Sequence, residues 1–251
     1  MKYLHLLSPI LLLLFPVEMS DALQQRVDLD KGLIAYYSFN DCDARDESGY
    51  GSDGDLYNVN CWCGIEDEGL LFDGIRSYVE FSGRVNKAFN TTDFSISFYV
   101  KPERDNIFQQ SLLSKRSACD SIQMFDIRMD TRNKKITTEV FEKPYKSYSD
   151  ISPDYESNGW VHYALVRKGR YAYTYINGAP QREGFRCSGV DISNETILSF
   201  SNSPCLGSGG ARRFKGILDE LKVYERALSS EEVLQLYEEI PIENANSDCY
   251  T

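Results

Sequence analysis

Histidine is almost absent from this 251-residue sequence, which contains only His5 and His162. A G-x-S-x-G motif is also absent, so nothing indicates a serine nucleophile activated by a histidine base. His162 lies in the stretch Trp160-Val-His-Tyr-Ala164, among apolar and aromatic residues. We interpret it as a structural residue of the core or of a sheet rather than as a general base.

A long apolar segment is missing as well. The stretch from Leu6 to Phe15 is almost wholly apolar but too short to span a bilayer, and no other stretch comes close. It follows the basic start Met1-Lys2 and precedes the small residues Ser20-Asp-Ala22, as in a cleaved signal peptide. We therefore predict a secreted protein without a transmembrane anchor. Its expected parts are a signal peptide (1–22), an N-terminal extension (23–31), one domain (32–240) and a polar tail (241–251).

Basic residues are outnumbered by acidic ones, which gives a net charge of −11. This charge argues against nucleic acid and against anionic membrane surfaces as partners. It is compatible with binding of calcium or neutral glycans, but we interpret it first as an ordinary soluble extracellular surface. The sequence contains no internal repeat, no low-complexity segment and no linker to a second domain, which indicates a single domain.

Cysteine occurs in an odd number, seven. In a secreted chain this number predicts three disulfides and one free or intermolecular thiol. The segment Cys61-Trp-Cys63 raises the alternative of a zinc site, but its C-x-C spacing differs from C-x-x-C and no second pair accompanies it. We therefore expect disulfides rather than a metal–thiolate site. The cysteines are Cys42, Cys61, Cys63, Cys119, Cys187, Cys205 and Cys249.

Two N-x-S/T sequons begin at Asn90 and Asn194. They make both asparagines candidate glycosylation sites of a glycoprotein, provided that the source organism glycosylates its secreted proteins.

Short stretches of alternating apolar and polar residues dominate the chain and predict β-strands. Two hairpins are expected, one from residues 122–129 and 134–141, the other from 160–167 and 171–176. Further strands are expected at 33–39 and 94–100. Many short strands separated by turn residues predict an all-β, two-sheet sandwich. Residues 142–158 are the longest candidate loop, and their three tyrosines suit either recognition or a mobile segment.

One short helix is expected near the C-terminus. Ser229 and Glu232 form a capping box, Val233, Leu234 and Tyr237 supply an apolar face, and a proline at position 241 ends the helix.

The stretch FKGILDELKVYERALSSEEV (214–233) places an acid within a strand pattern. With the two-residue period of a strand, Asp219 shares a face with Ile217 and Leu221, whereas Glu220 points to the opposite face. A carboxylate on an apolar face requires a partner. The candidates are a metal ion, an arginine of Arg212-Arg213 and backbone N–H groups.

Seven motifs of this sequence, in this order, resemble the laminin-G-like jelly rolls of the concanavalin A-like lectin/glucanase superfamily. The resemblance covers roughly residues 32–238 and implies an antiparallel jelly-roll sandwich of two curved sheets with a lone helix after the last strand. The motifs are GLIAYYSFND, DESGYGSDG, GLLFDGIRSYVEF, FSISFYVKP, GWVHYALVRKG, YTYING and FKGILDELKVYERALSSEEV.

The resemblance also implies one structural calcium ion, held by acids of the D-x-S-G-x-G loop, the F-D-G turn and the last strand. These positions are Asp46, Asp73 and Asp219. Calcium prefers six to eight carboxylate, carbonyl and water oxygens, which such loops can supply. The alternative is that Asp46 and Asp73 only stabilise turns, where aspartate is common.

Cysteine pairs follow from the same resemblance. Family members carry cysteines at positions that match the pairs Cys42–Cys61 and Cys119–Cys205. Cys63, Cys187 and Cys249 then remain, and Cys63–Cys187 is our choice for the third pair.

Glycoside hydrolases of this superfamily place two or three acids on one face of one strand. Asp126 and Asp130 share a face, with Arg128 between them, but they lie more than about 10 Å apart along a strand, too far for a retaining pair. We interpret them as part of a surface cross-strand network and predict that the protein is not an enzyme.

With catalysis set aside, binding of a ligand is the function that remains. Tyr171, Tyr173 and Tyr175 occupy one face of one strand and are weak candidates for a glycan platform, although tyrosine also favours strands for packing reasons alone. We expect a secreted, non-catalytic module that binds a carbohydrate or an extracellular protein. A structural or adhesive matrix component and a divergent glycoside hydrolase are the alternatives.

Overall fold

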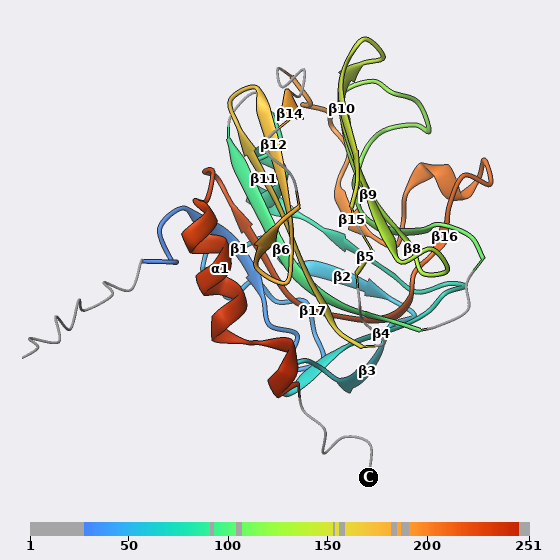
Figure 1. Cartoon of the computed structure of the whole chain (residues 1–251). Coiled ribbons are helices and arrows are strands. Elements are labelled where there is room, and N and C mark those ends of the chain that lie inside the picture. The colour runs from blue at the N-terminus through green and yellow to red at the C-terminus, as the bar shows by residue number, and fades with distance from the viewer. Residues whose placement is uncertain are drawn as a thin grey trace, which may run out of the picture.

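The structure is a computed structural model, and it describes residues 28–90, 93–103, 107–152, 154–155, 159–181, 185–186 and 191–245. Two antiparallel sheets pack face to face in a sandwich, as the sequence predicted, and one short helix follows the last strand (Figure 1). The expected signal peptide, Cys187, Cys249 and the last two residues of the Asn90 sequon lie outside the described residues.

The first sheet, called sheet A, runs in the order β13-β12-β11-β6-β17-β4-β3, with β1 paired to β17 and β14 paired to β12. Its strands are β1 (Leu33–Tyr37), β3 (Asn60–Cys63), β4 (Glu68–Asp73), β6 (Phe94–Pro102), β11 (Val161–Lys168), β12 (Tyr171–Ile176), β13 (Ala179–Pro180), β14 (Phe185–Arg186) and β17 (Lys215–Tyr224).

The second sheet, called sheet B, runs in the order β10-β9-β8-β7-β15-β5-β2, and β16 pairs in parallel with β7. Its strands are β2 (Gly54–Tyr57), β5 (Tyr78–Phe81), β7 (Gln110–Lys115), β8 (Met124–Asp130), β9 (Lys135–Lys143), β10 (Lys146–Ile151), β15 (Leu198–Phe200) and β16 (Arg212–Arg213). The short 3-10 helices are η1 (Gly83–Lys87), η2 (Pro204–Leu206) and η3 (Ile242–Asn244).

The core lies between the two sheets and follows the alternation of each strand. In β6, Phe94, Ile96 and Phe98 point inward, and in β8, Phe125 and Ile127 meet them from the other sheet. Each fully buried side chain of this kind contributes about 1.5–3 kcal/mol. The residues between them in sequence therefore point to the outer faces, where functional groups can collect.

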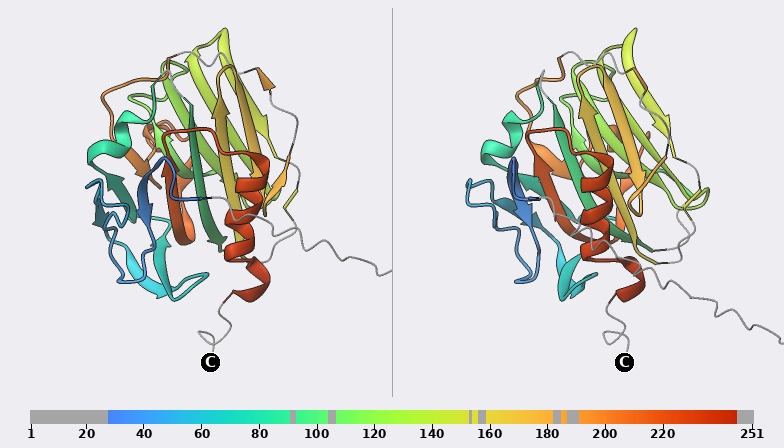
Figure 2. Two further views of the ribbon diagram at one scale, coloured as in Figure 1. Left: turned by 90° about the vertical axis from the view of Figure 1, so that its left-hand side faces the viewer. Right: turned by 60° about the vertical axis from the view of Figure 1, so that its left-hand side comes forward.

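Helix α1 (Ser230–Glu239) covers the outer face of sheet A (Figure 2). Both halves of the predicted capping box form, between Ser229 and Glu232. The buried apolar residues of the helix are Val233 and Leu236, whereas Leu234 is exposed, so the expected apolar face is partly wrong. No helix among the described residues is long and apolar enough to cross a membrane.

The last strand departs from the predicted alternation. Its pairing with β6 shifts between Asp219 and Lys222, and Glu220 adopts a φ of 50°. This β-bulge places one extra residue in the strand and reverses the faces beyond it. Leu218 before the bulge and Leu221 after it both enter the core, so Asp219 does not share the face of Leu221 as expected.

Residues 142–151, part of the expected long loop, form a hairpin instead. β9 extends to Lys143 and turns directly into β10, which makes a hairpin. Tyr148 and Tyr155 belong to the core, and only Tyr145, which is 80% exposed, points into solvent at the turn. The polar composition of this segment reflects two edge-region strands rather than an unstructured recognition loop.

Candidate functional site

The three carboxylates expected to bind calcium are engaged by hydrogen-bond donors at separate places. Asp46 accepts from the backbone N–H of Tyr36 (3.1 Å) and Ser52 (2.9 Å), and Asp73 accepts from the N–H of Ile75 (2.7 Å). Three such backbone donors hold the pKa of Asp73 well below its usual range, against the opposing effect of burial. Among the described residues, no three Asp, Glu, His or Cys side chains lie together as metal ligands.

Asp219 accepts from the backbone N–H of Ile65 (2.7 Å) and of Glu220 (2.9 Å), one of the kinds of partner that the sequence left open. Oxygen atoms of other residues also converge beside it. A Cβ on Gly64 would lie 2.2 Å from Oδ2 of Asp219 and 2.7 Å from the carbonyl oxygens of Glu66 and Glu68. Glycine therefore leaves open a cradle lined by three oxygens. The Asn40 side-chain amide lies 3.3 Å from the same two carbonyl oxygens. If the amide is oriented with its NH2 group toward these carbonyl oxygens, it donates to both of them. In the opposite orientation its oxygen faces them, and the three oxygens can bind a cation together.

Charge around this oxygen cradle is unbalanced toward the negative. Burial, and then the neighbouring Glu220, raise the pKa of Asp219 well above its usual range. Burial also raises the pKa of Glu220, against the opposing effect of Lys222, whose ammonium lies 2.9 Å from it. Glu220 is 2% exposed and also accepts from the Tyr36 hydroxyl (2.9 Å). Glu220 is therefore a buried acid held by two partners, Lys222 and Tyr36.

Two disulfides join described residues, Cys42–Cys61 and Cys119–Cys205, the pairs that the resemblance implied. Cys63 is disulfide-bonded as well, and its expected partner Cys187 lies outside the described residues.

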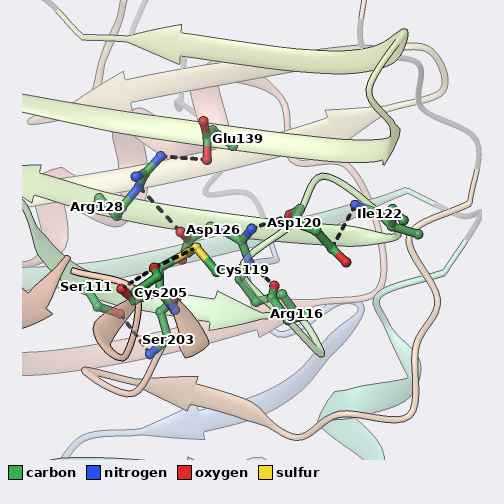
Figure 3. The surroundings of a disulfide bond; sticks show 12 residues. Ser111, Arg116, Cys119, Asp120, Ile122, Asp126, Arg128, Glu139, Ser203 and Cys205 are labelled. Carbon is green, nitrogen blue, oxygen red and sulfur yellow. Dashed lines mark hydrogen bonds and ion pairs between the residues drawn. A yellow bond between two sulfur atoms is a disulfide. The ribbon is translucent and has the colours of Figure 1, made fainter. Parts of the chain in front are cut away.

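The Cys119–Cys205 disulfide joins two loops over the outer face of sheet B, beside Asp126 and Arg116 (Figure 3). We call these two loops, residues 116–123 and 203–210, the disulfide lid. Beneath it, Asp126 contacts Arg116 (3.0 Å) and Arg128 (3.4 Å), and Arg128 in turn contacts Glu139 (2.6 Å).

The Asp126 network is cross-strand, as predicted, but it is not a surface network, because Asp126 is fully buried. Asp130 ends β8 and accepts from the backbone N–H of Asn133 (2.9 Å). Two acids so differently placed do not form a catalytic pair.

The outer face of sheet A exposes less of the predicted tyrosine stripe than the sequence indicated. Tyr175 is buried beneath α1, where its hydroxyl lies 3.1 Å from Ser230 Oγ. His162 is fully buried on the same face, with Nε2 2.8 Å from Ser97 Oγ, which supports its interpretation as a structural residue. Of the predicted tyrosine stripe, only Tyr171 at the strand end is exposed, at 47%.

An open aromatic surface lies instead on sheet B, where β5 pairs with the edge strand β2. Val79 and Phe81 enter the core, so Tyr78 and Glu80 point outward. The pairing brings Tyr57 opposite Tyr78, with ring centroids 4.3 Å apart and planes 6° from parallel. We call this surface the tyrosine platform. It consists of Asp55, Tyr57, Tyr78, Glu80, Asn202 and Arg213.

Polar groups surround the stacked rings of the platform. The Arg213 guanidinium lies 4.6 Å from the centre of the Tyr78 ring. Asp55 pairs with Glu80 across the strands, and Glu80 accepts from the Asn202 amide (3.0 Å). Flat rings beside planar amide, guanidinium and carboxylate groups can hold a sugar by stacking and by hydrogen bonds. The β2 and β5 segments alternate, but their pairing is not evident from the sequence.

The platform lies at one end of a row of polar side chains that crosses sheet B. The row follows the strand register, and its central members are covered by the disulfide lid, whereas both ends reach solvent. From β9 to the edge strand β2 it contains Glu139, Asp126, Ser114, Ser199, Glu80 and Asp55.

Solved structures share this fold. The binding domain of Paraclostridial Mosquitocidal Protein 1 superimposes with a TM-score of 0.68 at 17% identity, over 84% of this chain and 53% of that one. The binding domain of Botulinum neurotoxin DC, in complex with rat synaptotagmin II, gives 0.66 at 14% identity, over 85% and 52%. The chain thus spans about half the length of these toxin domains.

A third structure matches almost over its whole length. Domain 4 of AbnA, a GH43 extracellular arabinanase from Geobacillus stearothermophilus, in complex with arabinotriose, gives a TM-score of 0.58 at 19% identity, over 82% of this chain and 98% of that one. At such identities these likenesses concern the fold. No curated protein matches the sequence. The sequence model of Laminin_G_3 matches residues 73–234, more than half of the chain, and this protein therefore belongs to the concanavalin A-like lectin/glucanases superfamily.

Proposed function

We propose that this protein is a secreted, non-catalytic module that binds a carbohydrate at the tyrosine platform. The observation that carries the proposal is the Tyr57–Tyr78 stack on an open sheet face, flanked by Arg213, Asn202 and an acid pair. The arabinotriose bound to the arabinanase domain of like fold is compatible with it. Secretion is supported by the two disulfides, which persist in oxidising compartments.

The charges of the platform favour a neutral sugar. Asp55 and Glu80 lie directly opposite each other and would repel a carboxylate, but they can accept hydrogen bonds from sugar hydroxyls. Arg213 is already engaged by the carbonyl oxygen of Ser201 (2.7 Å) and by Asn202 (3.1 Å), which holds it in place beside the ring. We infer that the ligand is a neutral oligosaccharide.

A glycan array followed by calorimetric titration tests this proposal. We expect Tyr57→Ala to weaken binding of the best neutral ligand by about tenfold or more, because a stacking face is lost. Tyr171→Ala is the matched control, since Tyr171 is exposed on the other sheet. Loss of binding in the control alone would place the ligand on β12, and the absence of any saturable ligand would favour a matrix component. Hydrolysis of a bound glycan would contradict the non-catalytic assignment.

We further propose that a structural calcium ion binds at Asp219, together with the carbonyl oxygens of Glu66 and Glu68 and the side chain of Asn40. The oxygen cradle at Gly64 and the surplus of buried acid support this ligand set. Carboxylate, carbonyl and amide oxygens are the donors that calcium prefers. The ion would neutralise the buried acids and join the 64–68 segment to β17.

Calorimetric titration of the EDTA-stripped protein tests the calcium site. We expect binding to be lost in Asp219→Asn but retained in Asp73→Asn, whose carboxylate lies in a separate turn. Loss in both variants would support the ligand set implied by the resemblance, and no binding to the wild-type protein would end the proposal.

A further inference from the structure

A groove of about 640 Å³ opens where the chain leaves β5 and where it enters β15. We call it the end groove. One wall is formed by η1 and the residues after it, the other by the loop 193–197, and Lys115 at the end of β7 lies between them. A second groove of about 300 Å³ shares Lys87 and Asn90 with it. The combined space is within the range of small-ligand sites.

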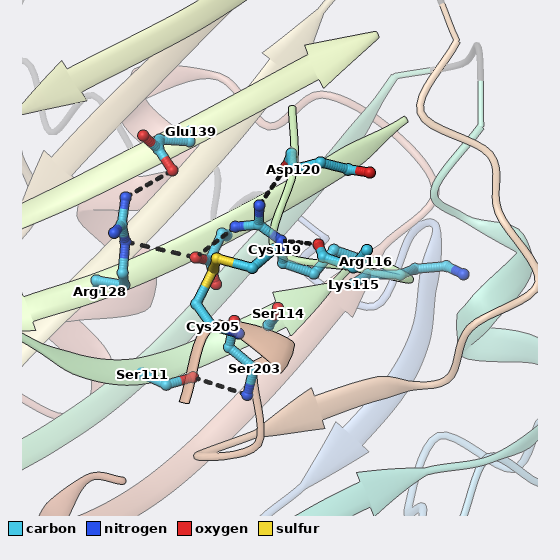
Figure 4. Close-up of polar contacts among 12 residues, drawn as sticks. Ser111, Ser114, Lys115, Arg116, Cys119, Asp120, Arg128, Glu139, Ser203 and Cys205 are labelled. Carbon is cyan, nitrogen blue, oxygen red and sulfur yellow. Dashed lines mark hydrogen bonds and ion pairs between the residues drawn. A yellow bond between two sulfur atoms is a disulfide. The ribbon is translucent and has the colours of Figure 1, made fainter. Parts of the chain in front are cut away.

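Two lysines, Lys87 and Lys115, line the end groove, and no ion pair joins either of them to a carboxylate of a described residue. Lys87 is exposed, and no described residue forms an ion pair with its ammonium, whereas its neighbour Arg84 pairs with Glu225 at 3.0 Å. Lys115 is buried and its side chain extends away from that of Arg116 (Figure 4). The lining therefore holds two lysines and one acid, Glu195, in a protein of net charge −11.

The Lys115 ammonium is held by neutral oxygens. It donates to the carbonyl oxygens of Asn194 (2.8 Å) and Thr196 (2.6 Å) and to Oδ1 of Asn194 (3.2 Å). Burial lowers the pKa of Lys115 to about 8, against the opposing effect of Glu195. A buried ammonium without a carboxylate in contact is poorly compensated, and an anion in the groove would stabilise its charge.

The remaining lining suits a sugar ring. Ile197 is 46% exposed at the rim and offers an apolar surface. Ser193, whose hydroxyl donates to Asp191 (2.5 Å), and Glu195 are exposed residues of the same wall. We propose that the end groove is a second carbohydrate subsite, which binds a carboxylate-bearing sugar of the hexuronic acid class with its acid group at Lys87. The inference extends the proposed carbohydrate function to a site that differs from the tyrosine platform in position and in charge.

The test uses the full chain, made in an oxidising compartment of a host that adds no N-glycans, since Asn90 lines the groove. The probes are tetragalacturonate and its fully methyl-esterified form, which keeps the rings but removes the charges. We expect saturable binding of the acid in calorimetric titration and binding of the ester weaker by about tenfold or more, because a charge-assisted contact is lost. Lys87→Gln should weaken binding of the acid by a similar factor, and the matched control Lys168→Gln should not.

Three results would overturn the inference. These are no binding of tetragalacturonate, equal binding of acid and ester, or equal effects of Lys87→Gln and Lys168→Gln. The variant Tyr57→Ala separates this inference from the proposed function. It should weaken binding of a neutral ligand by about tenfold or more and leave tetragalacturonate binding unchanged. A fourth contrary result would be loss of tetragalacturonate binding in Tyr57→Ala but not in Lys87→Gln, which would assign the acidic sugar to the platform.

Discussion

The guanidinium of Arg116 lies 3.0 Å from the carboxylate of Asp126, and the two side chains are only 4% and 0% exposed. Arg116 also donates to the carbonyl oxygens of Ala118 (2.8 Å) and Asp120. One buried cation therefore joins the backbone of the disulfide lid to the floor of sheet B. The lid is held by this contact and by the Cys119–Cys205 bond together.

We expect Arg116→Gln to lower the free energy of unfolding by about 3–5 kcal/mol, because it leaves Asp126 buried with less compensation. Arg45→Gln is the matched control, since the Arg45–Asp41 pair is exposed and should contribute at most about 1 kcal/mol. Urea unfolding of both variants measures the difference. A change in Arg116→Gln as small as that in the control would mean that water replaces the guanidinium beneath the lid.

The free energy of unfolding should depend on pH through His162 under acidic conditions. Burial, and then Lys222, lower the pKa of His162 to about 3, from 6.5 in the unfolded chain. Between these values the unfolded chain binds a proton that the folded chain does not. The free energy of unfolding should therefore fall as the pH decreases through this window, by up to about 1.4 kcal/mol per pH unit from this group.

The variant His162→Gln isolates this effect. Asp219 acts in the opposite direction, because its raised pKa makes the folded chain bind the additional proton. Urea midpoints of wild type and variant between pH 4 and 7 should therefore be compared as a difference of slopes, in which Asp219 cancels. Equal slopes would show that His162 is protonated, or reached by water, in the folded protein.

The oxygen atoms around Gly64 leave no room for a side chain at this position. A methyl group in Gly64→Ala would meet Oδ2 of Asp219 and two carbonyl oxygens at 2.2–2.7 Å. We expect a loss of about 1–3 kcal/mol in the free energy of unfolding and no rise of the melting temperature with calcium. Gly207→Ala is the control, since its φ is −68° and its nearest neighbour lies 3.8 Å from the added carbon. A calcium-dependent rise in Gly64→Ala equal to that of wild type would place the ion elsewhere.

The sequon at Asn194 should remain without a glycan. Its amide nitrogen donates to the carbonyl oxygen of Gln123 (2.6 Å), and Oδ1 accepts from the N–H of Thr196 (3.0 Å) and from Lys115 (3.2 Å). Mass spectrometry of peptides from a glycosylating host should find Asn194 unmodified. Asn194→Gln should lower the free energy of unfolding by about 1–3 kcal/mol through unmet buried polar groups.

Glu195→Gln provides the control for Asn194, because it keeps the sequon and changes only an exposed side chain. It should leave stability unchanged within about 0.5 kcal/mol. A glycan on Asn194 in a protein of wild-type stability would contradict the structural role of the amide.

Local patterns predicted the elements that depend on near neighbours in sequence. The alternation in 94–100 became β6, and the two expected hairpins became β8–β9 and β11–β12 within a few residues of their predicted ends. The capping box of Ser229 and Glu232 formed as predicted, because the hydrogen bonds that define it join residues of one helical turn.

The candidate sites depended on contacts that no local pattern encodes. The bulge at Glu220 is set by the pairing of β17 with β6. It removes Asp219 from the face of Leu221, which the strand alternation had predicted. The Tyr57–Tyr78 stack required the pairing of β2 with β5, and the covering of Tyr175 required the position of α1. Each of these features joins segments far apart along the chain.

By itself, the sequence determined the all-β sandwich, the capped helix and the superfamily, because alternation, turn residues and capping are short-range properties that recur along the chain. The tertiary structure alone decided which outward-facing groups remain open. Tyr57 and Tyr78 are partly exposed, whereas Asp126 lies buried under the disulfide lid and Tyr175 under α1. The physical reason is that a strand pattern divides side chains between two faces, but only the packing of distant segments decides whether water reaches the outer one.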